Sequence, residues 1–246
     1  MKTPQKIGII GNGNVGWHFQ NRLKALDYQV VTFSSKDKHL PQIVQNADID
    51  LLIICIQDAY YQHIIDILPA TDKIIAHTSG SLDMNILQKT TPNLGVIYPF
   101  QTLTKGYFID FEAVPLFIEA SNSATETILQ TIANKMSPLT RILSSQQRLF
   151  LHLSGCFASN FVNALYAAAA QILKEQNIDF ELIKPLIKET CYKIETLAPL
   201  QAQTGPAKRK DKLILQKHLS LLKDTHLKNV YQIMSQLIDY QQNKEY

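Results

Sequence analysis

The first hundred residues alternate short apolar runs with segments of helical spacing, and this alternation constrains the fold more than any other feature of the chain. Strands covered by helices on both faces are apolar along their whole length, so the pattern is typical of a parallel sheet between two helical layers. The apolar runs are residues 6–10, 28–33, 50–56, 73–79 and 94–100. We therefore expect an α/β domain with a doubly wound parallel sheet.

The pattern of apolar residues changes near residue 144, from alternating strand-like and helical segments to helical segments alone. Two more strand-like runs, 114–120 and 139–144, flank a helical stretch and complete the expected sheet, and beyond them only helix-length patterns follow. A chain of 246 residues is long enough for two domains with separate cores. The sequence thus predicts an α/β domain over residues 1–144 and an all-α domain over residues 145–246.

Three glycines, Gly11, Gly13 and Gly16, follow the first apolar run and open an amphipathic helical stretch. In a dinucleotide-binding βαβ unit the first makes a tight turn, the second lets the backbone approach the pyrophosphate, and the third lets the helix pack on the strand. The helix N-terminus adds free N–H groups and a positive dipole end. The competing interpretation is a turn without a ligand. We favour a phosphate cradle made of Gly11, Asn12, Gly13, Asn14, Val15 and Gly16.

The residues at the end of the second strand distinguish a site for NAD from a site for NADP. A carboxylate at this position binds the ribose 2′-hydroxyl of NAD. This chain instead has Ser34, Ser35 and Lys36, whose hydroxyls and positive charge suit the 2′-phosphate of NADP. Asp37 follows directly and keeps NAD as an alternative. The expected cofactor is NADP.

Three further loops follow the expected third, fourth and fifth strands, and doubly wound sheets bind ligands beyond the carboxyl ends of their strands. His77, in one of these loops, is a candidate proton donor near the nicotinamide. The alternative for residues 77–81 is a turn that caps a helix. Candidate cofactor contacts are Ile56, Gln57, Thr78 and Ser79. Candidate substrate contacts are Tyr98 and Gln101.

One helix-length segment, residues 149–173, carries no formal charge. About 20 apolar residues can span a bilayer, but the polar side chains scattered through this segment cost free energy in hydrocarbon. We therefore expect a buried central helix of a soluble domain. His152, Cys156, Asn160 and Asn163 form a polar stripe at helical spacing, which is either internally hydrogen-bonded or turned toward a ligand cleft. No further ligands of matching spacing accompany it, so we expect no metal site.

The last candidate is a turn between later helices, residues 204–211. Thr204 or Gly205 can cap a helix that opens at Pro206. A helix N-terminus followed by basic residues also suits a carboxylate or phosphate. Both interpretations are compatible with Thr204 and Arg209 holding an anionic part of a substrate.

Composition and charge indicate which partners and which cellular compartment the protein is expected to have. The formal charge of +3 is interspersed along the chain, so no surface for nucleic acid is indicated. Cys55, Cys156 and Cys191 lie far apart in apolar surroundings, which indicates buried thiols in a reducing compartment. The N-terminal apolar run is interrupted too early for an export signal. We expect a cytoplasmic protein with neither a nucleic-acid nor a membrane partner.

Five motifs occur in the order GNGNVG, HTSGS, YPFQTL, FASNF and TGPAKRKD. In this combination the chain resembles the Rossmann-like oxidoreductases whose C-terminal part is called domain of unknown function 2520. That group is similar to pyrroline-5-carboxylate reductase and to the β-hydroxyacid dehydrogenases. The resemblance implies a Rossmann dinucleotide-binding domain, a helical domain for substrate and dimerisation, NAD(P) as cofactor and a homodimer. By analogy with the dehydrogenases, Asn160 faces the nicotinamide.

The chain departs from the family's pattern at two places. Tyr98 stands where the family often has a histidine before proline, and Lys210 stands where the family has glycine between arginine and aspartate. The helical lysine of the related dehydrogenases has no counterpart here, which leaves the proton donor open between His77, His152 and a tyrosine.

The expected function is NADP-dependent transfer of a hydride to or from a small polar substrate that carries C=O or C=N. His77 or His152 donates the proton, and Asn160 orients the substrate. The alternative is a dinucleotide-binding regulator that performs no chemistry, which the absence of a clear acid–base pair favours.

Overall fold

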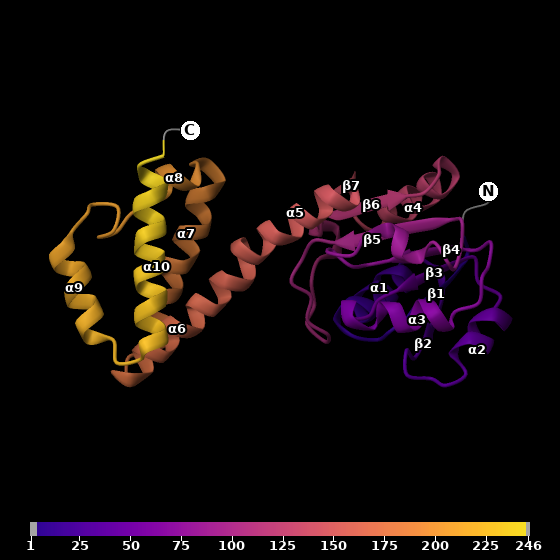
Figure 1. Cartoon of the computed structure of the whole chain (residues 1–246), viewed down its shortest axis with the longest axis horizontal. Coiled ribbons are helices and arrows are strands. Elements are labelled where there is room, and N and C mark those ends of the chain that lie inside the picture. Colours follow the sequence, from indigo (N-terminus) through magenta and orange to yellow (C-terminus); the bar gives the residue numbers. More distant parts are fainter. Residues whose placement is uncertain (1–3, 245–246) are drawn as a thin grey trace. The chain divides into compact units, whose positions relative to one another are not determined.

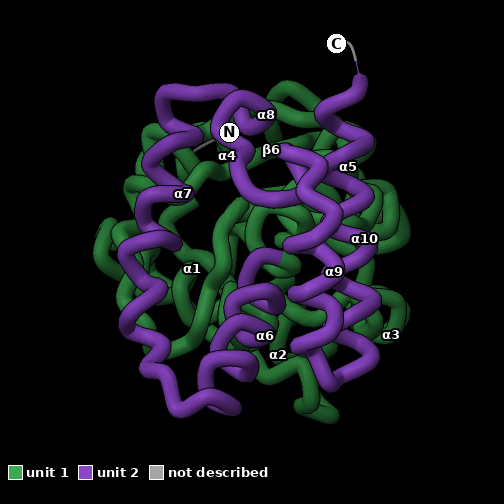
Figure 2. Tube along the Cα trace, turned by 90° about the vertical axis from the view of Figure 1, so that its left-hand side faces the viewer, with its two compact units in different colours: residues 1–161 green, residues 162–246 purple. Residues whose placement is uncertain are grey.

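The chain is described as a computed structural model over residues 4–244. It divides into two compact units, residues 1–161 and 162–246 (Figure 2). The last strand ends at Ile142, close to the predicted boundary at residue 144, but the helical turns that follow belong to the first unit. The assignment of separate functions to residues 1–144 and 145–246 stays a prediction.

The first unit is built on a seven-stranded sheet with the order β2-β1-β3-β4-β5-β6-β7 (Figure 1). The strands are β1 (Lys6–Ile10), β2 (Gln29–Phe33), β3 (Leu51–Ile54), β4 (Ile74–His77), β5 (Leu94–Pro99), β6 (Leu116–Ala120) and β7 (Thr140–Ile142). The pairs within β1 to β5 are all parallel, and the order reverses between β1 and β3. This confirms the doubly wound α/β fold.

Strand β6 departs from the expected parallel arrangement. It pairs antiparallel with β5, with Leu116 opposite Pro99. The chain between them, residues 100–115, contains one 3-10 turn, η3 (Phe111–Ala113), and no helix to carry it back across the sheet. The strand must therefore start at the edge where β5 ends. Residues 100–115 consequently stay at the carboxyl edge of the parallel strands.

Helices cover both faces of this sheet. On one face lie α1 (Asn14–Ala25) and α4 (Ser123–Met136), and on the other lie α2 (Leu40–Asn46), α3 (Tyr61–Ile67) and the 3-10 turn η2 (Met84–Leu87). Alternate strand residues point to opposite faces. Ile9 and Ile53 therefore join the core under α1 and α4, whereas Ile10 and Ile54 join the core under α2 and α3.

The uncharged segment lies in one continuous helix from Ser145 to Glu175. It consists of α5 (Ser145–Gly155), a π-helical turn η4 (Cys156–Asn160) and α6 (Phe161–Glu175). Its 31 residues, with a mean hydropathy of 1.3 in the most apolar stretch, are long and apolar enough to cross a membrane by length and composition. No part of that stretch is buried, so the predicted burial of this helix is wrong. Several of its large apolar side chains are exposed, Phe150 at 61% and Phe157 at 60% among them.

The second unit is helical throughout, as predicted. After α6 come the 3-10 turn η5 (Phe180–Ile183), α7 (Lys184–Thr196), α8 (Pro199–Ala202), α9 (Lys212–Leu221) and α10 (Thr225–Gln242). Among its described residues only Ala207 is buried, and Leu186 and Leu213 are 67% and 81% exposed. Its helices therefore present a large apolar surface.

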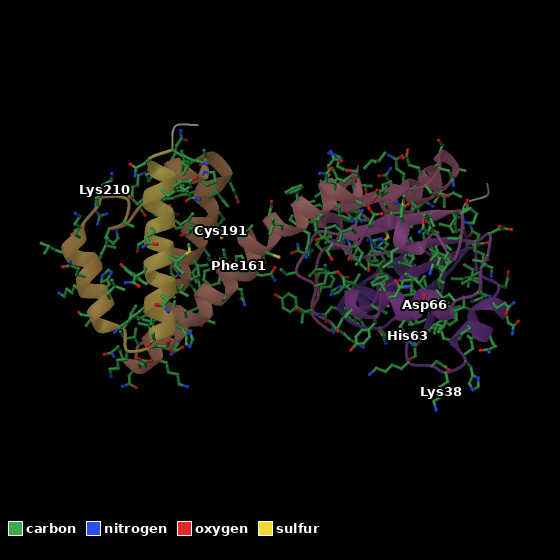
Figure 3. The ribbon with its side chains drawn as sticks, viewed as in Figure 1. Lys38, His63, Asp66, Phe161, Cys191 and Lys210 are labelled. Atoms are coloured by element: carbon green, nitrogen blue, oxygen red, sulfur yellow. The ribbon has the colours of Figure 1, made fainter. Side chains whose placement is uncertain are left out.

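The cysteines are all free thiols, but their burial differs from the prediction. Cys55 is buried beneath the glycine turn, Cys156 is half-buried, and Cys191 is exposed on α7 (Figure 3). The expectation of three buried thiols is confirmed for Cys55 and is wrong for Cys191, because the helices around Cys191 do not close over it.

Candidate functional site

The glycine turn lies at the carboxyl ends of β1 and β3, where the strand order reverses. Gly11 has a φ of +101°, and a Cβ there would lie 2.3 Å from the carbonyl oxygen of Cys55. A Cβ on Gly16 would lie 2.1 Å from the carbonyl oxygen of Gly11. Backbone packing therefore requires glycine at both positions.

Gly13 is different, because a Cβ there would meet no atom within 4 Å. Gly13 is the N-cap of α1; no side chain caps this helix, and its first turn holds no acidic residue. Such a helix start leaves N–H groups available to an anion. The turn is thus a cradle that fits a pyrophosphate and that a side chain at position 13 would fill.

An open cleft of about 910 Å³ lies over this turn. It brings together most of the predicted cofactor contacts, namely Gly11, Asn12, Gly13, Asn14, Val15, Ser35, Lys36, Ile56 and Gln57. Tyr60 and His63 also line it, and Figure 3 labels His63 on the ribbon. The strand tips in the sequence do not indicate these two residues, because they belong to the 3-10 turn η1 (Asp58–Tyr60) and to α3.

Four predicted cofactor contacts do not line the cleft. Gly16 packs beneath the turn, and the hydroxyl of Ser34 accepts a hydrogen bond from the N–H of Lys36 at 3.2 Å. Thr78 and Ser79 are buried, and their hydroxyls bond to nearby backbone atoms. Residues 77–81 form a turn, but the N-cap of the 3-10 turn η2 that follows is Asp83, whose carboxylate accepts a hydrogen bond from the N–H of Asn85 at 2.8 Å.

The tip of β2 presents a cation to the cleft. Lys36 lines the cleft and is exposed. The carboxylate of Asp37 does not line it and instead accepts a hydrogen bond from the N–H of His39 at 2.8 Å. Lys38 extends from the surface at the same loop (Figure 3). This arrangement suits a ribose 2′-phosphate better than a 2′-hydroxyl.

A second cavity, of about 430 Å³, lies between the chain after β5 and the helical turns α5 and η4. It brings together four predicted site residues: Tyr98, Gln101, His152 and Asn160. The hydroxyl of Tyr98 and Nδ1 of His152 are hydrogen-bonded at 3.0 Å. Burial raises the pKa of Tyr98 to about 12, so the phenol keeps its proton at neutral pH and can donate a hydrogen bond to Nδ1 of the imidazole.

Two glycines that the sequence analysis overlooked shape this cavity. A Cβ on Gly80 would lie 2.7 Å from Nδ1 of His152 and 2.8 Å from Cζ of Tyr98. A Cβ on Gly155 would lie 2.7 Å from the ring of Phe100. The HTSGS turn therefore packs directly against the Tyr98–His152 pair, and the glycine inside that motif was the available signal.

The π-helical turn η4 modifies the predicted polar stripe. A π-helical turn bonds residue i to i+5 and so changes which side chains share a face. His152 and Asn160 both line the cavity, whereas Cys156 does not. Asn163 is exposed and belongs to the second unit. Single π turns inside α-helices are frequent at functional sites, which agrees with the place of η4.

His77 lines neither cavity and is fully buried. Its Nδ1 accepts a hydrogen bond from the N–H of Ser79 at 3.1 Å, and its Nε2 has no partner among the described residues. Burial and, second, the charge of Arg148 lower the pKa of His77 to about 3. The ring is therefore neutral near pH 7, and of the two candidate histidines it is His152 that lines the second cavity.

A buried ion pair holds the HTSGS turn against α5. Arg148 is 1% exposed, and its guanidinium bonds to the carboxylate of Glu119 and to the carbonyl oxygens of Ser79 and Leu82. Ser145 also donates to the Glu119 carboxylate, at 2.7 Å. The sequence does not indicate this role for Arg148, because a single arginine on a helix usually lies on its solvated face.

The structure of residues 204–211 differs from the prediction that a helix starts at Pro206. No helix opens at Pro206; α9 begins at Lys212, where the carboxylate of Asp211 accepts the N–H of Ile214 at 3.2 Å. Asp211 is an effective N-cap, and this displaces the start of the helix. Lys210 has a φ of +57°, a conformation that the glycine of the family pattern adopts without strain. Thr204 and Arg209 lie in the second unit and stay candidates for binding an anion.

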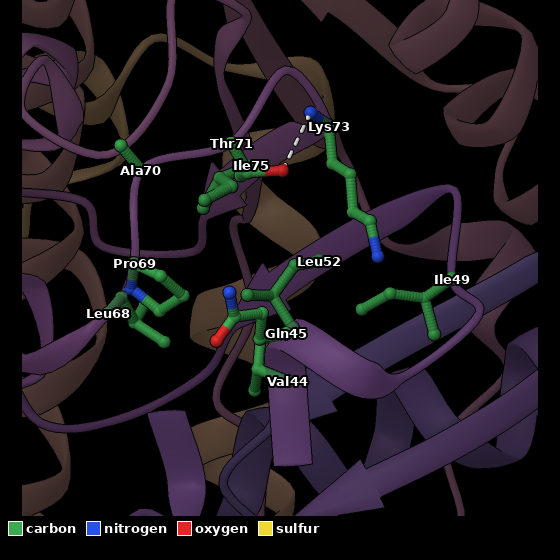
Figure 4. A pocket seen from close by; sticks show the side chains of 10 residues that line it. All are labelled: Val44, Gln45, Ile49, Leu52, Leu68, Pro69, Ala70, Thr71, Lys73 and Ile75. Carbon is green, nitrogen blue, oxygen red and sulfur yellow. Dashed lines mark hydrogen bonds between the residues drawn. The ribbon is translucent and has the colours of Figure 1, made fainter. Parts of the chain in front are cut away.

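A further small pocket, of about 60 Å³, has a mostly apolar lining that includes Leu52 of β3 and Val44 of α2 (Figure 4). Lys73 donates through its backbone N–H to Thr71 and through Nζ to the carbonyl oxygen of Ala47, at 3.3 and 2.7 Å. Its ammonium is thus engaged in holding two loops together. Within residues 4–244 no three His, Cys, Asp or Glu side chains gather to hold a metal ion.

Comparison with known proteins agrees with this geometry. The family described as Domain of unknown function (DUF2520) matches residues 114–238. The solved structure of an inferred NADP oxidoreductase from Bacteroides fragilis is 32% identical, with a TM-score of 0.86 over 96% of this chain and 98% of that one. A comparison with curated proteins finds no match.

Two more distant solved structures share the fold. A reductive aminase from Aspergillus terreus, in complex with NADPH and ethyl levulinate, is 15% identical with a TM-score of 0.69 over 97% of this chain and 99% of that one. The 1-pyrroline-5-carboxylate reductase of Streptococcus pyogenes is 12% identical with a TM-score of 0.59 over 96% and 98%. Matches of this extent necessarily include most of the helix from Ser145 to Glu175.

Proposed function

Because the chain belongs to the DUF2520 family, we propose that it is an NADP-dependent oxidoreductase that transfers a hydride to or from the C=O or C=N group of a small polar substrate. The observation that carries the proposal is the hydrogen-bonded Tyr98–His152 pair in a cavity of the unit that also holds the phosphate cradle. Oxidoreductase activity with NADP is the inferred role of the Bacteroides fragilis protein, which is 32% identical.

The residues of the cleft divide between the pyrophosphate and the ribose 2′-phosphate of NADP. The backbone at Gly13 and Asn14 would hold the pyrophosphate, and Ser35 with Lys36 would hold the ribose 2′-phosphate. Bound NADPH supplies the hydride. The cleft over the glycine turn, with its uncapped helix start, supports this assignment.

His152 would move the proton. Because the phenol of Tyr98 keeps its proton at neutral pH, it can donate to Nδ1, which leaves the imidazole proton on Nε2. As Nε2 passes this proton to the oxygen or nitrogen of the substrate, the phenolic proton of Tyr98 can move to Nδ1, so that the imidazole stays neutral, and solvent returns a proton to the phenol. Asn160, which lines the same cavity, would orient the substrate. Thr204 and Arg209 of the second unit stay candidates for binding an anion.

We expect His152→Ala to lower kcat/KM about a hundredfold or more, because a positioned general acid contributes about 10²–10⁴ in rate. Tyr98→Phe should cost about tenfold, since the ring stays but its hydrogen bond to His152 is lost. The assay follows NADPH oxidation with small cyclic imines, 1-pyrroline-5-carboxylate among them, and with keto compounds plus an amine.

The control is His226→Ala, which removes an exposed histidine of the second unit and should leave the rate unchanged. Equal rates for His152→Ala and His226→Ala would remove His152 from the mechanism. If NADPH binds but no substrate of the panel oxidises it, the result contradicts hydride transfer and favours the dinucleotide-binding regulator.

The helical unit would associate with a second copy of the chain in the cytoplasm. Its α6, α9 and α10 line an apolar cavity of about 430 Å³, and Leu182 and Leu221 are 71% and 69% exposed. Apolar surface of this extent usually marks an interface. Light scattering should therefore return twice the chain mass of 27.9 kDa, and a mass of one chain would overturn the dimer.

A further inference from the structure

The segment that follows β5 is fixed at three points to the glycine turn and to α1. The backbone N–H of Lys105 donates to Oδ1 of Asn14 at 3.1 Å, and Nζ of Lys105 donates to the carbonyl oxygen of Asn12 at 3.0 Å. Nε2 of His18, on α1, is hydrogen-bonded to the carbonyl oxygen of Thr104 at 3.0 Å. The ammonium of Lys105 is thereby held at the edge of the phosphate cradle, although the residue lies more than ninety positions further along the chain.

On the basis of the proposed function, we propose that Lys105 is a cofactor-binding residue whose ammonium neutralises the pyrophosphate of the dinucleotide. Asn12 and Asn14, which Lys105 contacts, both line the cleft and flank Gly13, the open position of the turn. A phosphate seated on the N–H groups of this turn would therefore meet the ammonium across the same edge.

The described lining of the cleft does not itself place a lysine or arginine at the glycine turn, where the pyrophosphate would bind. Among the described residues that line it, Lys36 is the one lysine or arginine, and it lies at the tip of β2. The pyrophosphate carries two negative charges and would otherwise meet N–H dipoles alone. A cation that donates a hydrogen bond to a phosphate forms the stronger, charge-assisted kind.

The ammonium of Lys105 is free to take this role. A lysine ammonium has three N–H donors, and the contact with Asn12 uses one of them. Across residues 4–244 no carboxylate lies within 4.0 Å of Nζ of Lys105 to compete for its charge. The residue is exposed, so its replacement leaves the core intact.

The test compares the affinities for NADPH and for NADH in the full chain, measured by calorimetry. Both dinucleotides carry the pyrophosphate, and NADPH alone carries the 2′-phosphate. Lys105→Met should raise the Kd of both about tenfold, and Lys105→Arg should restore most of the loss, because it returns the charge. Lys36→Met should raise the Kd of NADPH alone. Lys89→Met, which removes an exposed lysine outside the cleft, is the matched control and should change neither.

Equal affinities for Lys105→Met and Lys89→Met would overturn the inference while the proposed cofactor stands. A loss confined to NADPH would also overturn it, since it would place Lys105 at the 2′-phosphate. If the unaltered chain binds neither dinucleotide, the proposed function itself fails, and the inference fails with it.

Discussion

Replacing Gly13 with valine is expected to raise the Kd for NADPH at least a hundredfold while the fold survives. A Cβ at this position meets no protein atom within 4 Å, so the folded chain accepts the larger side chain. The same side chain fills the space that the pyrophosphate needs against the backbone at the start of α1. A hundredfold loss corresponds to about 2.8 kcal/mol of binding free energy.

The measurement is a fluorescence titration with NADPH, whose nicotinamide absorbs where tryptophan emits. Trp17, the single tryptophan of the chain, follows Gly16 on α1 and reports on this site. Gly16→Val is the contrasting variant, because a Cβ there lies 2.1 Å from a backbone oxygen and should destabilise the unit itself. Unchanged affinity in Gly13→Val would move the cofactor to another part of the chain.

The second large effect is expected for Arg148→Met, which should lower the free energy of unfolding of the first unit by about 3–5 kcal/mol. The guanidinium is 1% exposed and bonds to Glu119 and to two carbonyl oxygens of the turn after β4. Its removal leaves a partly buried carboxylate without its cation and carbonyl groups without a donor. Urea unfolding followed by the emission of Trp17 measures this change, because Trp17 lies in the same unit.

Arg141→Met provides the matched control. Arg141 is exposed and bonds to the carbonyl oxygen of Thr140 at 2.8 Å, so its loss should cost less than about 0.5 kcal/mol. The double variant Arg148→Met with Glu119→Gln should recover part of the stability, because a neutral amide then replaces the unpaired carboxylate. If Arg148→Met unfolds at the same urea concentration as Arg141→Met, the buried pair does not stabilise the unit.

Much of the fold is predictable from the sequence because burial on both faces makes each central strand uniformly apolar. The runs at residues 6–10 and 94–100, for example, contain β1 and β5. The direction of β6 is not encoded in this pattern. It depends on whether the connection of residues 100–115 contains a crossover helix, and here it does not.

The phosphate cradle is predictable because three glycines at fixed spacing each meet a separate backbone requirement. The pair of Tyr98 and His152 is harder to predict, since the two residues lie 54 positions apart in sequence and meet only once the helix α5 returns to the sheet. Arg148 and Gly80 were missed for the same reason. The roles of these two residues depend on tertiary contacts, which the neighbouring sequence does not predict.

The prediction of a buried central helix was wrong for a physical reason. The apolar content of a helix shows that its side chains require a packing partner, but it does not show whether that partner belongs to the same chain. Among the described residues 162–244, many large apolar side chains are exposed and Ala207 alone is buried, which a second copy would explain.

The most direct test of the account is a crystal structure of the chain with NADPH bound. We expect the pyrophosphate to lie on the backbone at Gly13 and Asn14, the 2′-phosphate to meet Lys36, and the nicotinamide to reach the cavity of Tyr98 and His152. A dinucleotide bound away from the glycine turn, or a nicotinamide directed away from that cavity, would contradict it.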